Sequence, residues 1–241
     1  MAYDEYINRN SWKAGQPVSQ WLAKRTLNEI LRLTKINPSA TAVLEIGSGF
    51  GYFAECVEST NFNSYTAFEP NSKLANLTRS KTKNGKVYEL ALPSIPVGFS
   101  NSFDVVVCIH VLEHAPNGYE ALSWITSVKT LLKDGGQLII ISPSISDYKS
   151  YFWEIDWSHC FPTSNNNLRQ ILLDLDFKIS NERIFRLGST RRPLTTMAKL
   201  LDCLIPTRVL NTFGNLMIGR PLGTGLKAAF IWGSTFMVAV K

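Results

Sequence analysis

The sequence predicts an α/β fold in which helices cover both faces of a doubly wound β-sheet with seven strands. Strand-like apolar runs alternate along the chain with segments of helical periodicity, and this alternation is typical of such sheets. Residues 103–109 are apolar almost throughout, as expected for a strand that is buried on both faces. In residues 43–51 a short apolar run leads into a glycine-rich turn, so a ligand could approach bare main chain there.

The predicted elements follow in regular order after an irregular start. Residues 1–17 are polar and aromatic, with Gly15 and Pro17, so we expect a loose arm. Residues 143–163 are aromatic and irregular, which is typical of a lid or binding loop. Apolar side chains at helical spacing predict two helices within 194–218. The other predicted helices are 18–35, 52–59, 71–81, 117–132 and 164–175, and the strands are 43–46, 65–69, 87–90, 103–109, 137–142, 177–185 and 234–240.

The four cysteines, Cys56, Cys108, Cys160 and Cys203, are scattered along the chain. They form neither a CxxC pair nor a metal-ligand spacing, so we expect unpaired thiols in a reducing cytoplasm and no metal site. The first residues lack the basic and apolar regions of a signal peptide. The apolar run at 228–240 is too short and too interrupted to span a bilayer. These features predict a cytoplasmic protein.

The net charge of +6 is unevenly distributed. Residues 183–241 carry a charge of +8, whereas residues 1–182 carry −2. A basic C-terminal quarter can simply be a solvated surface. It can also attract an anionic partner, such as a phosphorylated substrate or a membrane surface.

The glycine-rich turn helps to decide between two kinds of adenosine cofactor. A dinucleotide-binding fingerprint requires a glycine at position 52, where this chain has Tyr52. Glycines stand instead at Gly47, Gly49 and Gly51, and the following helix offers unpaired N–H groups to a polar or anionic ligand group. Glu69, about 20 residues beyond the turn, is placed to accept hydrogen bonds from ribose hydroxyls. The pattern therefore disfavours a nicotinamide dinucleotide.

The segment Glu45-x-Gly47-x-Gly49-x-Gly51 resembles motif I of the class I S-adenosylmethionine-dependent methyltransferases. Residues 101–114 resemble that family's fourth strand and the turn after it, and residues 131–141 resemble its helix, glycine turn and fifth strand. The resemblance spans residues 40–185. It implies a Rossmann-like methyltransferase fold, a mostly parallel sheet with an antiparallel last strand, S-adenosyl-L-methionine as the cofactor, and methyltransferase activity.

Length and resemblance together predict one methyltransferase domain over residues 1–241. We expect an N-terminal arm and helix at 1–37 and a cofactor-binding core at 38–185. Residues 186–241 would hold a helical pair, inserted before the last strand, and that strand. The acceptor pocket is expected from the arm, the 143–163 loop and the C-terminal helices.

The resemblance also implies which residues contact the cofactor. Many members of the family carry an acidic residue after the third strand that contacts the adenine, and this chain has no aspartate at that place. We therefore expect adenine contacts from the main chain around Leu90–Leu92. The full set of expected cofactor-binding residues is Glu45, Gly47, Ser48, Gly49, Gly51, Glu69, Pro70, Ala91, Leu92 and His110.

Methyl transfer is an in-line displacement, in which the protein must align donor and acceptor. If the acceptor is a hydroxyl, a base with a pKa near neutrality helps. The three histidines of the chain, His110, His114 and His159, all fall where the resemblance places the substrate pocket. His159 belongs to a segment, with Asp156, that resembles an aspartate–histidine segment of many family members. Each of the three is a candidate catalytic residue, although a single histidine is more often a hydrogen-bonded structural residue than a base.

The most favoured function is O-methylation of a small molecule or of a sugar or glycan intermediate. Alternatives are a quinone or polyketide-type O-methyltransferase, a catalytically silent cofactor-binding module, and, least favoured, a nicotinamide oxidoreductase. The Asp/Asn-Pro-Pro-aromatic motif of base N-methylating enzymes is absent after the predicted fourth strand, which argues against N-methylation of a nucleic-acid base and leaves RNA methylation by another subclass as a minor alternative. The basic C-terminal region also allows an anionic or lipid-linked acceptor and peripheral contact with the inner face of a membrane through residues 186–227.

Overall fold

The computed structural model describes residues 17–186, 196, 200, 207–218 and 232–241, and its seven strands form one sheet in the order β3-β2-β1-β4-β5-β7-β6. β7 runs antiparallel to both of its neighbours, and the other pairs are parallel. The predicted doubly wound, Rossmann-like sheet is therefore confirmed. The strands are β1 (Ala42–Ile46), β2 (Ser64–Phe68), β3 (Lys86–Tyr88), β4 (Phe103–Ile109), β5 (Leu132–Pro143), β6 (Lys178–Phe185) and β7 (Ser234–Val240).

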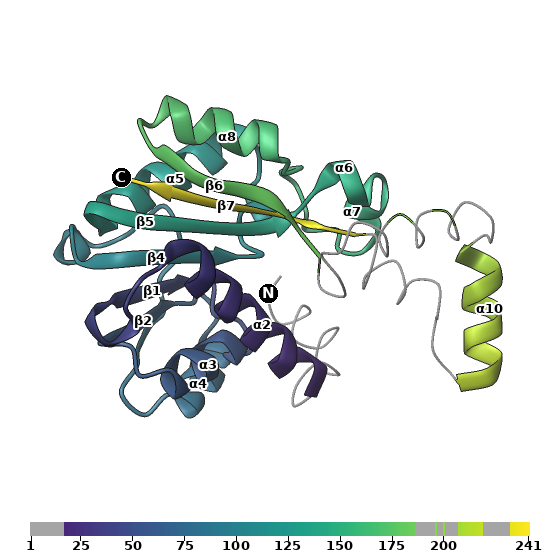
Figure 1. Cartoon of the computed structure of the whole chain (residues 1–241), viewed down its shortest axis with the longest axis horizontal. Coiled ribbons are helices and arrows are strands. Elements are labelled where there is room, and N and C mark those ends of the chain that lie inside the picture. The colour runs from purple at the N-terminus through teal and green to yellow at the C-terminus, as the bar shows by residue number, and fades with distance from the viewer. Residues whose placement is uncertain (1–16, 187–195, 197–199, 201–206, 219–231) are drawn as a thin grey trace.

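Helices cover both faces of the sheet, as Figure 1 shows. The described α-helices are α2 (Pro17–Thr34), α3 (Tyr52–Ser59), α4 (Ser72–Lys81), α5 (Gly118–Leu131), α6 (Ile145–Tyr148), α7 (Tyr151–Glu154), α8 (Asn165–Asp174) and α10 (Thr207–Ile218). Short 3-10 turns are η2 (Pro38–Ala40), η3 (Val97–Phe99) and η4 (Leu112–His114). None of the described helices is long and apolar enough to cross a membrane.

The hydrophobic core lies in two layers on either side of the sheet. Val106 and Cys108 of β4 pack with buried side chains of α5 and α8, whereas Val105 and Val107 pack with those of α2 and α3. This alternation follows from the two-residue period of a strand. It explains why β4 is apolar at successive positions, since both of its faces are buried.

Strand order places a crevice above the middle of the sheet. The chain winds in one direction from β1 through β2 to β3, and it returns to the other side of β1 with β4. The loops after β1 and β4 therefore diverge at the carboxyl ends of neighbouring parallel strands. Ligands of open α/β sheets bind at such a switch point.

Capping side chains set several helix boundaries. The Asn71 side chain accepts hydrogen bonds from the N–H groups of Lys73 and Leu74, and the Asn117 side chain accepts one from Glu120. Ser164 caps α8 in a reciprocal pair with Asn167. Such caps satisfy N–H groups that lack a partner inside the helix. The predicted helices at 71–81 and 117–132 therefore begin one residue too early.

Other expectations differ from the structure or lie beyond it. Residues 143–163, predicted as irregular, contain the short helices α6 and α7, and β5 begins five residues before the predicted start at 137. The loose arm at 1–16 lies outside the described residues, as does most of the first predicted C-terminal helix. The second is confirmed as α10. Its apolar side chains Val209, Phe213 and Leu216 are exposed, so this apolar stripe does not lie in the core.

Candidate active site

The turn between β1 and α3 is built on backbone conformations that favour glycine. Gly47, Gly49 and Gly51 have φ angles of +72°, +52° and +71°, in the left-handed region that L side chains avoid. A Cβ on Gly47 would lie 2.7 Å from Cγ2 of Val111, and one on Gly51 would lie 2.9 Å from Cα of Thr78. A Cβ on Gly49 would meet nothing within 4 Å. Two glycines thus allow close packing of the turn, and Gly49 borders open space.

That open space is a pocket of about 280 Å³ at the carboxyl ends of β1, β2 and β4. Eight of the residues singled out from the sequence line it: Gly47, Gly49, Glu69, Pro70, Ala91, Leu92, His110 and His114. The wall is completed by residues that sequence reasoning did not single out, namely Ile46, Phe68, Leu74, Val111, Trp124, Trp157 and Ser158, and by Leu90.

Glu69 connects the loops after β1 and β2. One carboxyl oxygen accepts a hydrogen bond from the N–H of Gly49 at 2.9 Å, and the other accepts one from the N–H of Asn71 at 3.0 Å. Burial raises the pKa of Glu69, and these two hydrogen bonds oppose that shift. Because each carboxylate oxygen can accept more than one hydrogen bond, Glu69 still has capacity for a ligand hydroxyl.

Three of the predicted cofactor residues, Glu45, Ser48 and Gly51, do not line the pocket but support the turn from behind. The Ser48 hydroxyl lies 2.9 Å from that of Thr78, and the carboxyl of Glu45 accepts a hydrogen bond from the Tyr65 hydroxyl. Burial raises the pKa of Glu45 from 4.5 to about 8, against the hydrogen bond from Tyr65, which lowers it. Successive strand side chains point to opposite faces. Since Ile46 faces the pocket, its neighbour Glu45 faces the other layer.

The wall after β3 is apolar. Leu90, Ala91 and Leu92 line it, and the preceding acidic residue, Glu89, does not line the pocket. Glu89 is exposed and accepts hydrogen bonds from the Ser72 hydroxyl at 2.5 Å and from Arg79 at 3.2 Å. Adenine recognition by the main chain at 90–92 thus stays a prediction that these contacts leave open.

The opposite wall carries two of the three histidines. His110 and His114 both line the pocket. Nδ1 of His114 lies 3.0 Å from the hydroxyl and 3.3 Å from the carbonyl oxygen of Ser158. The Ser158 hydroxyl in turn donates to Asp156 at 2.7 Å. Hydrogen bonds from Ser158 outweigh burial and lower the pKa of Asp156. This chain of contacts fixes the orientation of the His114 ring.

His159 does not line the pocket but lies directly behind His114. The two ring centroids are 5.1 Å apart, and Nδ1 of His159 lies 2.7 Å from the carbonyl oxygen of Phe152. Burial lowers the pKa of His159, although Glu113 and the Phe152 carbonyl oppose the shift. The neutral imidazole is therefore the favoured form.

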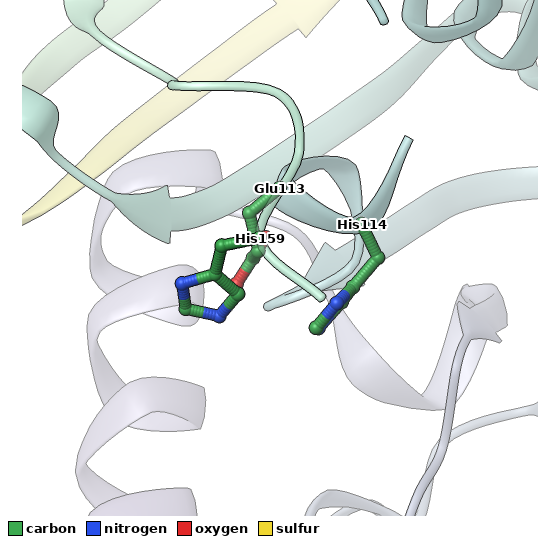
Figure 2. A group of neighbouring side chains, drawn as sticks. All are labelled: Glu113, His114 and His159. Carbon is green, nitrogen blue, oxygen red and sulfur yellow. The ribbon is translucent and has the colours of Figure 1, made fainter. Parts of the chain in front are cut away.

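Glu113 is a buried acid that sequence reasoning missed. Its carboxyl accepts a hydrogen bond from the Ser142 hydroxyl at 2.8 Å and lies 3.1 Å from Nδ1 of His110. Burial alone would raise the pKa of Glu113, but the hydrogen bond and charge of His110, with the charge of His114, lower it below its ordinary value. Figure 2 shows Glu113, His114 and His159 together. The available signal was an acid three residues after His110 and next to His114.

The sheet order, the glycine turn and the pocket define a Rossmann-like, class I methyltransferase whose cofactor is S-adenosyl-L-methionine. A family model described as a methyltransferase domain matches residues 19–182, and the chain belongs to that family. A comparison with curated protein sequences gives no match.

Solved structures share the fold. An S-adenosylmethionine-dependent methyltransferase from Archaeoglobus fulgidus has a TM-score of 0.65 at 18% identity, covering 98% of this chain and 99% of that one. A methyltransferase in complex with the Haloferax volcanii activator Trm112 has a TM-score of 0.70 at 13% identity, covering 99% and 95%. Magnesium protoporphyrin IX methyltransferase from Synechocystis has a TM-score of 0.58 at 15% identity, covering 90% and 82%. At these identities the likeness shows the fold alone.

The residues around the pocket fit the cofactor. The absence of a side chain at Gly49 leaves room against the main chain, and the buried Glu69 carboxylate retains acceptor capacity on the pocket side. Leu74, Leu90 and Leu92 offer an apolar surface for a purine ring. Most of the expected cofactor-binding residues thus line one pocket, whereas Glu45, Ser48 and Gly51 lie behind the turn.

Proposed function

We propose that this enzyme transfers a methyl group from S-adenosyl-L-methionine to a hydroxyl of a small molecule or of a sugar or glycan intermediate. The observation that supports this function is that Gly49 and Glu69 share one pocket with His110 and His114. Donor-binding residues and proton-accepting residues thus face the same space. Alignment of donor and acceptor is the main requirement of methyl transfer.

Each wall has its own role in this proposal. Gly47 and Gly49 would hold the amino-acid end of the cofactor, Glu69 its ribose, and the main chain of Leu90–Leu92 its adenine. When bound, the cofactor supplies an electrophilic methyl group. The acceptor would lie against His110, His114 and Trp157. A neutral His114 has Nε2 available to take up the hydroxyl proton, because Ser158 engages Nδ1.

An acceptor screen with labelled methyl donor tests the reaction. Purified protein should transfer label to hydroxyl acceptors, with glycans, quinones and polyketide phenols as separate arms of the panel. Transfer confined to amines would contradict O-methylation. Tighter binding of a nicotinamide dinucleotide than of S-adenosylmethionine would contradict the proposed donor site.

Glu69→Gln should weaken S-adenosylmethionine binding by roughly 1–3 kcal/mol, or about 5- to 150-fold. Glutamine has a single acceptor oxygen, so it cannot accept from Gly49 and Asn71 on separate oxygens while also binding the ribose. Isothermal titration calorimetry measures the change. Glu89→Gln is the matched control, because this exposed acid does not line the pocket. Equal affinity for S-adenosylmethionine in the two variants would contradict a contact between Glu69 and the ribose.

We also propose that the protein is cytoplasmic and touches the inner face of the membrane through part of residues 186–227, which would suit an anionic or lipid-linked acceptor. The support within the described residues is α10, on which Val209, Phe213 and Leu216 are exposed. These positions follow helical spacing, so the three side chains share one side of α10. The side chains of the basic residues Arg191, Arg192, Lys199 and Arg208 lie outside the described structure.

Phe213→Asp should reduce co-sedimentation of the protein with anionic vesicles several-fold at low salt. The substitution replaces an exposed aromatic ring by a charge that an anionic surface repels. Asn215→Asp adds the same charge at an exposed polar position of α10 and should have a smaller effect. Binding of the unaltered protein should fall as salt rises. Absence of vesicle binding at low salt would contradict the membrane contact and leave methyl transfer unaffected.

A further inference from the structure

We infer that Glu113, His114 and His159 form a binding site for a divalent transition-metal ion. The potential ligand atoms of these three side chains all lie within 4.8 Å of one another. Figure 2 shows the two imidazole rings beside the Glu113 carboxyl group. Glu113 and His114 belong to η4, and His159 lies in the loop between α7 and α8. The site was not expected from the sequence, because its members are brought together only by the fold.

Hydrogen bonds fix the tautomer of both rings. Nδ1 of His159 faces the carbonyl oxygen of Phe152, which can only accept, so Nδ1 carries the hydrogen. Nδ1 of His114 faces the carbonyl and hydroxyl oxygens of Ser158, and that hydroxyl donates onward to Asp156. In each neutral ring Nε2 then carries the lone pair. Metal-binding histidines show this arrangement, in which the second nitrogen donates to a carbonyl or another oxygen.

Glu113 places a carboxylate oxygen within 4.8 Å of one ring nitrogen of each histidine. The side chain is completely buried, and within the described residues no lysine or arginine forms an ion pair with it. Ser142 donates to one carboxyl oxygen, and the N–H groups of Cys160 and Phe161 donate to the main-chain carbonyl of Glu113. The loop that carries His159 is thereby tied to η4. Two imidazole lone pairs and a carboxylate form an acceptor-rich set that a cation would complete.

The donor types indicate the kind of cation. Two imidazole nitrogens and one carboxylate oxygen suit Zn²⁺ and neighbouring transition metals, whereas Mg²⁺ and Ca²⁺ prefer oxygen ligands. Because His114 also lines the pocket, an ion can enter from it and retain positions for water or substrate. Binding of the ion does not depend on the proposed function. A catalytic role for the ion rests on the proposed methyl transfer. An ion there would polarise an acceptor hydroxyl, with His114 then serving as ligand in place of proton acceptor.

Zinc titration of the metal-free protein tests the site. After dialysis against a chelator, calorimetry should show one Zn²⁺ bound per chain, and Co²⁺ should give the absorption spectrum of a nitrogen- and oxygen-ligated ion. Glu113→Gln preserves the shape of the side chain, and His114→Ala truncates a partly exposed one. Each should weaken Zn²⁺ affinity at least about tenfold. His110→Ala removes a neighbour of Glu113 outside the three-ligand set and should change affinity less than either ligand variant.

Two further measurements separate the possible results. Cys160→Ser should leave the titration unchanged, since a thiolate does not belong to the site; loss of binding in that variant would overturn the assignment. Circular dichroism establishes whether each variant folds. If Glu113→Gln does not fold, the Zn²⁺ affinity of His114→Ala alone tests the site. No saturable binding, or unchanged affinity in folded His114→Ala, would overturn the metal site. S-adenosylmethionine binding to metal-free protein reports on the donor site separately.

Discussion

Gly49→Ala is expected to weaken S-adenosylmethionine binding at least about 100-fold, which corresponds to about 3 kcal/mol. The added methyl group would meet no protein atom within 4 Å, so the loss would come from the space that the cofactor requires. The N–H of residue 49 survives the substitution and can still donate to Glu69. The left-handed backbone, with a φ of +52°, should reduce the free energy of unfolding by only about 1–2 kcal/mol.

Gly135→Ala is a closely matched control for this substitution. Gly135 has a φ of +76°, and a Cβ built on it also meets nothing within 4 Å. It lies near the start of β5, at the end of the sheet opposite to the pocket. Both variants should lose similar stability in thermal denaturation, and only Gly49→Ala should lose cofactor affinity in calorimetry. Unchanged affinity in Gly49→Ala would contradict the proposed position of the cofactor.

The residues of the proposed donor side could be singled out from the sequence because their signals are local. Gly47, Gly49 and Gly51 indicate the turn from β1 to α3, and Glu69 follows at the end of the next strand. In a doubly wound sheet such positions converge at the carboxyl edge. Four of the six pairs of neighbouring strands also follow one another in sequence, and only the pairs β1–β4 and β5–β7 join strands that do not.

The proposed acceptor side depends on contacts between distant segments. Ser158 meets His114 across 44 residues, and Ser142 meets Glu113 across 29. Trp124 reaches the pocket from α5, where its position in a helix gives no sign of a ligand. No local sequence pattern predicts such long-range contacts. The sequence also does not distinguish a buried carboxylate such as Glu113 from an ordinary exposed one.

The position of Glu45 was predictable in principle from strand periodicity. Leu44 and Ile46 pack in the layer with α5 and α8, whereas Val43 packs in the layer with α2 and α3. Glu45 alternates with Ile46 and so shares the side of Val43, where its carboxyl accepts a hydrogen bond from the Tyr65 hydroxyl. The motif resemblance favoured cofactor contact for this residue, and side-chain alternation favours a supporting position.

In the unaltered protein, Glu45 is expected to make the free energy of unfolding fall as pH rises, and Glu45→Gln should abolish this contribution. The pKa of Glu45 is raised by burial from 4.5 to about 8, so between these values the folded state holds a proton that the unfolded state has released. The free energy of unfolding must therefore fall as pH rises through this window. Each unit of pKa difference corresponds to 1.36 kcal/mol, so the decline is on the order of 5 kcal/mol.

Glutamine is neutral at every pH and close in shape to the protonated acid, so the variant should resemble the unaltered protein near pH 5 and exceed its stability near pH 9. Urea denaturation across this range measures the difference between the two proteins.

Subtracting the unfolding free energies of the two proteins removes the contributions of other titrating groups. Glu69 has a raised pKa, which acts in the same direction as that of Glu45. Glu113 and Asp156 have lowered pKa values, which act in the opposite direction. Tyr65, with a pKa well above 10, stays protonated throughout and keeps its hydroxyl as a partner for residue 45. A pH-independent difference between the proteins would mean that Glu45 is ionised in the folded state, despite the two apolar layers that bury the sheet around it.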